Sequence, residues 1–308
     1  MQKAYMTALC ELAQKDANVL SLLADSGTGY DELFRRYFPR QMLDFGIAEE
    51  NMVAAAAGLA SCGKIPFVYT AGAFLAYRSF EFIRDDICFQ NKNVKLVGMG
   101  AGLSWSTLGV THHTTEDLGA LRALPNLTIF SPSCPREVEQ VVKAAYEING
   151  PVYIKIGMNN EPDVYGGESE FRVGRAVLLR EGSGVCILTT GAVAAEVLGA
   201  ARLLEEDGIS VAVLNYPTVA PFDADSVRDA AARYPALVTV EEHSITGGLG
   251  SAAAEVLAES GLAVRFRRIG LPGTFAQGYG THAQVRAANG LDAAGICRQI
   301  RTILSAAR

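Results

Sequence analysis

The sequence predicts an α/β protein of two doubly wound domains, each with a mainly parallel sheet. Short apolar segments alternate with helical stretches in the first half of the chain, a polar segment containing Gly and Pro follows, and the alternation then restarts. Such alternation is typical of βαβ units, in which helices cover both faces of a parallel sheet. A chain of 308 residues is long enough to bury one core in each of two domains.

Residues 1–160 are expected to form the first domain. Short apolar segments predict its strands, at residues 19–24, 65–69, 94–97, 127–130 and 152–156. Segments with helical periodicity separate them, near residues 3–15, 50–62, 73–88 and 135–148. This order predicts one parallel sheet with helices on both faces.

Residues 161–178 are polar, contain Gly and Pro, and are expected to be a linker. Residues 179–308 should then form the second domain. Its expected strands are residues 185–189, 211–214, 237–240 and 264–269, and its expected helices lie near residues 191–206, 224–233, 247–260 and 292–306. The same alternation predicts a second α/β sheet.

The composition argues against two classes of partner. A net charge of −6 and a pI near 5.4 disfavour binding to nucleic acid or to an anionic membrane surface. The chain has no apolar run long enough to span a bilayer, and its first residues lack the apolar core of a signal peptide. Its six cysteines form no C-x-x-C pair, which favours free thiols in a reducing compartment. We therefore expect a cytoplasmic protein that acts on small molecules.

Three features could build a catalytic site. Glu49 begins a predicted helix, Phe74, Tyr77 and Phe80 follow at i, i+3 and i+6 of another, and Thr111-His112-His113 closes a glycine-containing loop. Each has an ordinary explanation. A helix start favours any carboxylate, most aromatic stripes on helices belong to a core, and a loop histidine often has no function. Their combination in this order favours a site.

The same residues carry a resemblance to the C-terminal two-thirds of the transketolase superfamily. The segment from Asp44 to Met52 is similar to the one that carries the family's catalytic glutamate, and Phe74-Leu-Ala-Tyr77 is similar to its aromatic step. Thr111-His112 resembles the end of its donor-binding loop. Residues 240–251 and 270–275 resemble its C-terminal domain, so the resemblance covers nearly the whole chain.

The resemblance implies thiamine diphosphate as the cofactor. Glu49 would share a proton with N1′ of the aminopyrimidine, and the ring would lie in a slot of Phe74, Tyr77 and Phe80. Asp25 matches an acidic position near the cofactor, although a strand-end Asp that caps a turn explains it equally well. His112 would hydrogen-bond the donor, and the neighbouring His113 could serve instead. The protein supplies orientation and proton transfer to such a cofactor.

One part of the family pattern is absent. Family members bind the diphosphate and its metal ion through a Gly-Asp-Gly motif, and this sequence has none. The chain therefore resembles one subunit of a split transketolase, whose N-terminal-type partner brings the diphosphate site and the Mg²⁺ or Ca²⁺ ion, so no metal ligands are expected here. An α2β2 assembly that transfers a two-carbon ketol or acyl unit is implied.

Three departures concern the donor. An aspartate that binds a donor hydroxyl is replaced by Leu108, and two arginines that grip sugar phosphate are replaced by Gln2 and Met158. We therefore expect donors without the usual phosphate grip. Two alternatives stay open from the sequence: the β subunit of a 2-oxoacid dehydrogenase, and a non-catalytic scaffold subunit.

Overall fold

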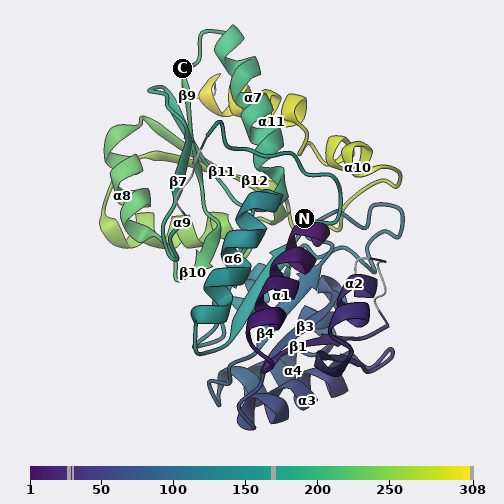
Figure 1. The fold of residues 1–308 in the computed structure, drawn as a ribbon. Helices are drawn as coiled ribbons and strands as arrows, with labels where there is room; N and C mark the ends of the chain where they lie inside the picture. Colours follow the sequence, from purple (N-terminus) through teal and green to yellow (C-terminus); the bar gives the residue numbers. More distant parts are fainter. Residues whose placement is uncertain (26–28, 30, 168–170, 306–308) are drawn as a thin grey trace.

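The computed structural model describes residues 1–25, 29, 31–167 and 171–305. Two α/β domains lie side by side, with the first half of the chain in one and most of the second half in the other (Figure 1). Each is built on a mainly parallel sheet, which confirms the predicted fold class. Within the described residues, no helix is both long and apolar enough to cross a membrane.

The first sheet has seven strands in the order β10-β5-β6-β4-β3-β1-β2. Its strands from the first domain are β1 (Val19–Leu23), β2 (Met42–Asp44), β3 (Ile65–Ala71), β4 (Lys95–Met99), β5 (Thr128–Phe130) and β6 (Val152–Ile156). These strands pair in parallel. The five strands predicted for residues 1–160 are confirmed. The sequence reading missed β2, a short edge strand with mostly exposed side chains.

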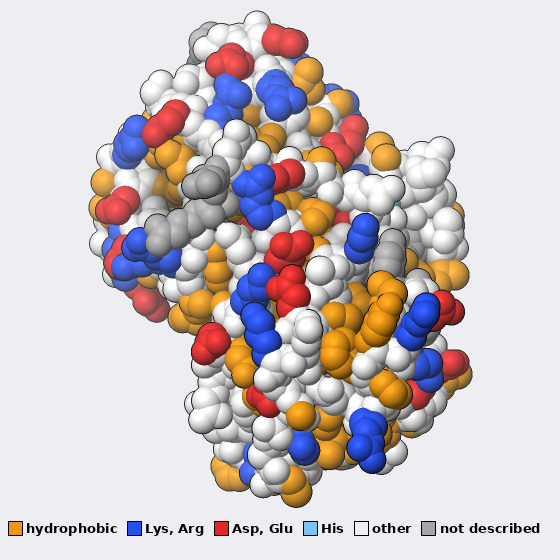
Figure 2. Space-filling model, viewed as in Figure 1, with side chains coloured by type: hydrophobic (Ala, Val, Ile, Leu, Met, Phe, Trp, Pro, Cys, Tyr) orange, Lys and Arg blue, Asp and Glu red, His pale blue; other side chains and the backbone are white. Residues whose placement is uncertain are grey.

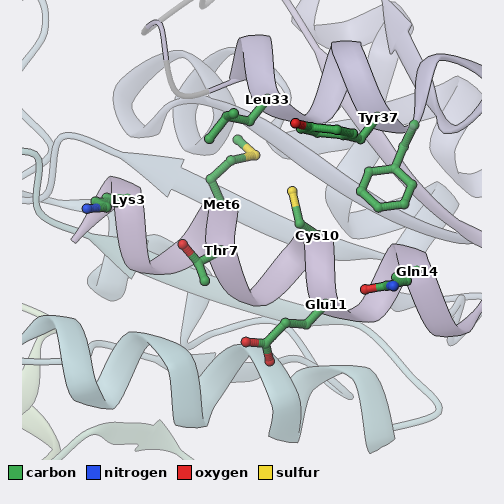
Figure 3. Close-up of a pocket in the computed structure, with 9 residues that line it drawn as sticks. Lys3, Met6, Thr7, Cys10, Glu11, Gln14, Leu33 and Tyr37 are labelled. Atoms are coloured by element: carbon green, nitrogen blue, oxygen red, sulfur yellow. The ribbon is translucent and has the colours of Figure 1, made fainter.

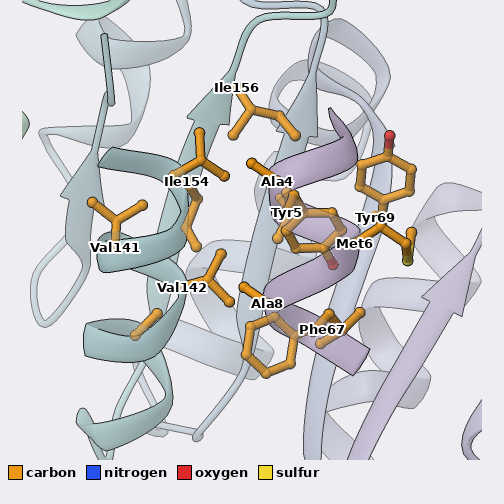
Figure 4. Close-up of a cluster of buried hydrophobic side chains, with 14 of the residues drawn as sticks. Ala4, Tyr5, Met6, Ala8, Phe67, Tyr69, Val141, Val142, Ile154 and Ile156 are labelled. Carbon is orange, nitrogen blue, oxygen red and sulfur yellow. The ribbon is translucent and has the colours of Figure 1, made fainter. Parts of the chain in front are cut away.

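Helices cover both faces of this sheet. On one face α1 (Gln2–Lys15) packs beside α6 (Pro135–Glu147), and Figure 4 shows Ala4, Tyr5 and Ala8 of α1 directed at the strands. Tyr5 stacks on Tyr69 with ring centroids 5.0 Å apart. On the other face α3 (Glu49–Ser61) and the segment after Phe74 pack on β1, β3 and β4. The loops at the carboxyl ends of the central strands lie between the two helical layers, and this is where an α/β sheet commonly forms a site.

The expected helix 73–88 is helical but irregular. Two π-helical segments, η2 (Phe74–Arg78) and η3 (Ile83–Cys88), flank a single turn, α4 (Phe80–Phe82). A π-helical turn holds more residues than an α-helical turn, so side chains rotate about the axis relative to regular spacing. The i, i+3, i+6 pattern therefore does not place the three aromatic side chains on one face. Such π-segments are frequent at functional sites.

The second sheet has five strands in the order β12-β11-β8-β9-β7. They are β7 (Val177–Arg180), β8 (Val185–Thr189), β9 (Val211–Asn215), β11 (Ala236–Ser244) and β12 (Arg265–Leu271). Helices α7 (Ala194–Glu206) and α11 (Ala293–Ser305) cover one face, and α8 (Ala224–Arg233) and α9 (Leu249–Ser260) cover the other. The edge strand β7 is antiparallel to β9 and begins inside the stretch expected to be a linker.

The two domains share a strand and a close backbone contact. Strand β10 (Thr218–Ala220) comes from the second half of the chain but pairs with β5 at the edge of the first sheet. Gly119 lies in α5 (Asp117–Leu121), where a Cβ atom would be 3.1 Å from the Thr246 carbonyl. Arg122 donates to the Gly247 carbonyl at 2.6 Å. The sequence reading missed α5, α2 (Asp31–Tyr37) and α10 (His282–Ala288), which are all short.

Candidate active site

A pocket of about 290 Å³ opens at the carboxyl ends of β1, β3 and β4. It gathers four of the residues expected to bind the cofactor or the donor, Asp25, Glu49, Phe74 and His112. Its remaining lining residues are Ala24, Ile47, Thr70, Ala71, Met99, Trp105 and Leu108. A carboxylate, aromatic rings and an apolar wall therefore meet in one place.

Glu49 is the buried acid of this pocket. It is the first residue of α3, where the helix dipole favours a carboxylate, and it is 1% exposed. The preceding turn is held by Asp44, whose side chain accepts from the backbone N–H groups of Gly46 at 3.0 Å and Asp25 at 3.2 Å. Arg78 donates from Nη1 to Glu49 Oε2 at 2.7 Å. Glu50, the next residue, is half-buried and does not line the pocket.

Three rings line the pocket that Glu49 borders. The imidazole of His112 meets the edge of Phe74 with centroids 5.1 Å apart, and Trp105 lies 5.9 Å from the same imidazole. Thr111 Oγ1 lies 2.9 Å from His112 Nδ1. His112 is thus held between two rings with one nitrogen engaged. The sequence reading missed Trp105, although it is the only Trp in the chain.

Two glycines shape the loop that carries His112. Gly100 has φ +83°, and a Cβ atom there would be 2.0 Å from Trp105 Nε1. Gly102 has φ +59°, and a Cβ atom there would be 2.5 Å from Glu242 Oε1. Gly102 and Thr114 close the loop with a pair of backbone hydrogen bonds at 3.1 and 2.9 Å. A side chain at either glycine would displace the group that packs there.

Three of the expected site residues lie elsewhere. Tyr77 is 40% exposed, its hydroxyl donates to Glu116 at 2.8 Å, and it lines a second pocket of about 410 Å³. His113 lines that second pocket as well; it is buried, and its two ring nitrogens have no hydrogen-bond partner among the described residues. Phe80 is half-buried and packs against the core between α3 and the sheet. Among the described residues, Phe74 is therefore the one residue of the predicted aromatic slot that lines the Glu49 pocket.

The second domain holds the loop in place through Glu242. This carboxylate, 7% exposed, accepts from the Leu103 backbone N–H at 2.6 Å and lies 2.7 Å from His282 Nε2. Arg286 donates to its other oxygen. Burial favours the neutral acid, but Arg286 and His282 outweigh it, so the pKa of Glu242 lies well below its ordinary value. The charged form of Glu242 fixes the start of the loop that ends in His112.

A larger apolar groove lies away from this chemistry. Its volume is about 800 Å³, and Figure 3 shows Met6 and Cys10 of α1 facing Leu33 and Tyr37 of α2 across it. It shares no lining residue with the Glu49 pocket. Figure 2 shows hydrophobic side chains gathered on this face of the first domain, with charges of both signs scattered around them.

The Glu49 pocket fits one half of thiamine diphosphate. A nearly fully buried carboxylate requires a cationic or proton-sharing partner, and the aminopyrimidine is such a partner with an apolar ring. Glu49 and the ring of Phe74 would hold it. Over residues 1–25, 29, 31–167 and 171–305, no group of three His, Cys, Asp or Glu side chains is placed to bind a metal ion. The described residues therefore suit the pyrimidine and offer no metal site for the diphosphate.

Comparisons with known proteins identify both domains. The transketolase pyrimidine-binding domain matches residues 1–160, and the transketolase C-terminal domain matches residues 174–296. One subunit of the apulose-4-phosphate transketolase of Actinobacillus succinogenes is 36% identical over 281 residues, which cover 91% of this chain and 90% of that protein. The 6-deoxy-6-sulfo-D-fructose transketolase subunit SqwH of Clostridium sp. is 37% identical over 278 residues, covering 90% and 86%.

A solved structure and a longer relative complete the comparison. The structure described as a split gene transketolase, inactive beta4 tetramer, superposes with a TM-score of 0.88 at 36% identity and covers 100% of this chain and 98% of that one. The 1-deoxy-D-xylulose-5-phosphate synthase of Chlorobium phaeovibrioides is 36% identical over 304 residues, but the match spans 47% of its length. The chain belongs to the transketolase family, as a transketolase-type subunit with the pyrimidine-binding and C-terminal domains.

Proposed function

We propose that this chain supplies the pyrimidine-binding half of a thiamine diphosphate site and works with a second subunit as a two-chain transketolase. The complex would transfer a two-carbon ketol or acyl unit from a ketose or 2-oxo donor to an acceptor. The observation that carries the proposal is the buried carboxylate of Glu49, which faces a ring-lined pocket beside His112.

Each pocket residue has a defined task in this proposal. When bound, thiamine diphosphate supplies a nucleophilic carbon and an electron sink for cleavage of the donor. Glu49 would share a proton with the pyrimidine nitrogen, because a buried carboxyl group can give a proton to a ring nitrogen and take it back. Phe74 would contribute an apolar wall for the ring. His112, held between Phe74 and Trp105, is placed at the same pocket to hydrogen-bond a donor oxygen.

The partner subunit would bring the diphosphate and Mg²⁺ or Ca²⁺ site. Support comes from the sequence, which has no Gly-Asp-Gly motif, and from relatives named as transketolase subunits. A structural relative is a tetramer described as inactive and made of β chains. We propose an α2β2 assembly in which the partner completes the pocket around Glu49.

Cofactor titration tests the division of the site. Isothermal titration of thiamine diphosphate with Mg²⁺ into the isolated chain should give little heat, because the diphosphate and metal ligands are missing. The same titration into the complex with the N-terminal-type subunit should saturate. Tight binding and turnover by the isolated chain would refute the need for a partner.

The proposed donor specificity depends on the charges of the residues that replace the family's phosphate-gripping arginines. Gln2 and Met158, at the two positions where the family's phosphate-gripping arginines fall, line one cavity of about 380 Å³. Its charged lining residues are Lys3, Glu139 and Glu161, so carboxylates outnumber cationic side chains there. The Gln2 amide is buried, 3.1 Å from Tyr69 Oη and 2.6 Å from Met99 Sδ, and Met99 also lines the Glu49 pocket. We propose that this cavity takes the far end of a donor without phosphate.

The name of one relative points to the competing outcome, since it contains a sugar phosphate, whereas the name of another contains a sulfo-sugar without phosphate. Matched phosphorylated and unphosphorylated ketose donors should be compared by kcat/KM on the complex. Burial of an unpaired phosphate costs several kcal/mol, roughly a thousandfold in affinity, so the unphosphorylated donor should be preferred. Met158→Arg is the matched variant and should raise kcat/KM for the phosphorylated donor. A strong preference of the unmodified complex for phosphate would refute the proposal.

A further inference from the structure

Arg78 already makes the two contacts that the proposed cofactor ring requires. Its Nη1 donates to Glu49 Oε2 at 2.7 Å, and its guanidinium carbon lies 5.0 Å from the centroid of the Phe74 ring. A planar cation over an aromatic face with one N–H directed at a carboxylate is a favourable arrangement. A pyrimidine that shared a proton with Glu49 and stacked on Phe74 would use the same oxygen and the same ring.

The Arg78–Glu49 ion pair stabilises the chain when no cofactor is bound. The Glu49 side chain is 2% exposed, and a buried carboxylate without a partner is strongly unfavourable. Among the described residues, Arg78 is the one side chain that donates a hydrogen bond to it. Arg78 therefore stabilises the pocket in the absence of any ligand.

Arg78 is also free to leave. Its side chain is 43% exposed, so solvent already reaches about half of it and can hydrate the guanidinium after it moves. It is the last residue of the π-helical segment Phe74–Arg78. The thiazolium ring of thiamine diphosphate carries a positive charge, which disfavours a second cation near it.

We propose that Arg78 occupies the place of the aminopyrimidine on Glu49 and Phe74, and that the cofactor displaces it on binding. This inference rests on the proposed function and adds a property of the same site. The cofactor has to break the Arg78–Glu49 ion pair before it can bind, so Arg78 lowers cofactor affinity while it protects the unliganded carboxylate.

Titration of thiamine diphosphate with Mg²⁺ into the assembled two-subunit complex tests the displacement. Arg78→Met removes the competitor and leaves Glu49 without a partner until the cofactor arrives, so the dissociation constant should fall by about five- to tenfold. Arg84→Met is the matched control, because Arg84 lies in the following π-helical segment, η3, but pairs with the exposed Asp85. The control should bind like the unmodified complex.

A double-mutant cycle on the isolated chain tests the ion pair without any cofactor. Arg78→Met should lower the equilibrium constant for folding by about tenfold or more, because it leaves a buried carboxylate unpaired. In the Glu49→Gln background the same change should have a much smaller effect. Equal effects in both backgrounds would show that the pair is not formed and would overturn the inference.

The outcomes separate the two proposals. If the unmodified complex binds the cofactor and Arg78→Met binds it equally or more weakly, Arg78 is not a competitor and only this inference is overturned. If none of the complexes binds thiamine diphosphate, the proposed function is refuted, and the displacement with it. Tighter binding by Arg78→Met alone, together with coupling to Glu49, supports both.

Discussion

Two buried glutamates mark the two functional regions of the molecule. Glu49 is 1% exposed and Glu242 is 7% exposed, and each is paired with an arginine. Glu242 has three partners, the Leu103 N–H, His282 and Arg286, and this arginine is itself 8% exposed. Glu49 has the single partner Arg78 among the described residues, and it borders an open pocket.

The difference separates a carboxylate with several fixed partners from one with a single exchangeable partner. A carboxylate held by several fixed donors does not readily exchange them. The pKa of Glu242 is low because Arg286 and His282 outweigh the effect of burial. A buried charge with one half-exposed partner can exchange that partner for a ligand. The number and mobility of the partners, rather than burial itself, distinguish the two sites.

The largest expected effect is on catalysis at the Glu49 pocket. Glu49→Gln should lower turnover of the two-subunit complex by about two to four orders of magnitude, because the amide can still hydrogen-bond a ring nitrogen but cannot share a proton. Folding and subunit assembly should be retained. Steady-state kinetics on the complex would check this, with Glu50→Gln as the control of mild effect. Comparable turnover for Glu49→Gln and the unmodified complex would remove Glu49 from the mechanism.

Substitutions at Glu242 should change the free energy of unfolding. Glu242→Ala removes one member of a buried ion cluster and leaves Arg286 and His282 facing each other, which should cost about 3–5 kcal/mol. Urea unfolding of the isolated chain measures this. Glu242→Gln keeps the shape and one acceptor and should cost less. A loss below about 1 kcal/mol for Glu242→Ala would show that the cluster does not hold the domains together.

A smaller loss of stability should come from a substitution at Gly102, in the loop between Glu242 and the Glu49 pocket. Gly102→Ala places a Cβ atom 2.5 Å from Glu242 Oε1 at φ +59°, so it should destabilise the chain by about 1–3 kcal/mol. Gly63→Ala is the control, because Gly63 has φ +82° but no neighbour within 4 Å of its added Cβ. The excess cost at Gly102, measured by thermal unfolding, reports the contact with Glu242. Equal costs at both glycines would show that the contact is unimportant.

The smallest effect concerns His113, buried next to the loop. Burial lowers the pKa of its imidazole, although Glu242 and Glu116 act in the opposite direction. The unfolded chain therefore takes up the proton first as the pH falls below about 6.5, and the folded state loses stability over that range. His113→Asn should make the loss on acidification smaller. Unfolding free energies at pH 7.5 and at several lower values test this, and identical slopes in both proteins would contradict it.

Much of the fold was predictable because its pattern is local. The buried central strands appear as short apolar runs, and the helices between them have helical periodicity, so every strand predicted from the sequence is present. The missed strands are short or lie at sheet edges. Strand β7 is half-exposed, and β10 pairs with a strand of the other domain, so neither has a pattern that a local window can recognise.

The sequence by itself determined the two-domain α/β fold and the position of Glu49, because a carboxylate at a helix start and an alternation of short elements are properties of neighbouring residues. Only the tertiary structure decided which side chains meet. Arg78 pairs with Glu49 across 29 residues, and Glu242 reaches Leu103 across 139. The π-helical segments also turned Tyr77 away from Glu49. Contacts between distant segments depend on the packing of whole elements, which local spacing does not encode.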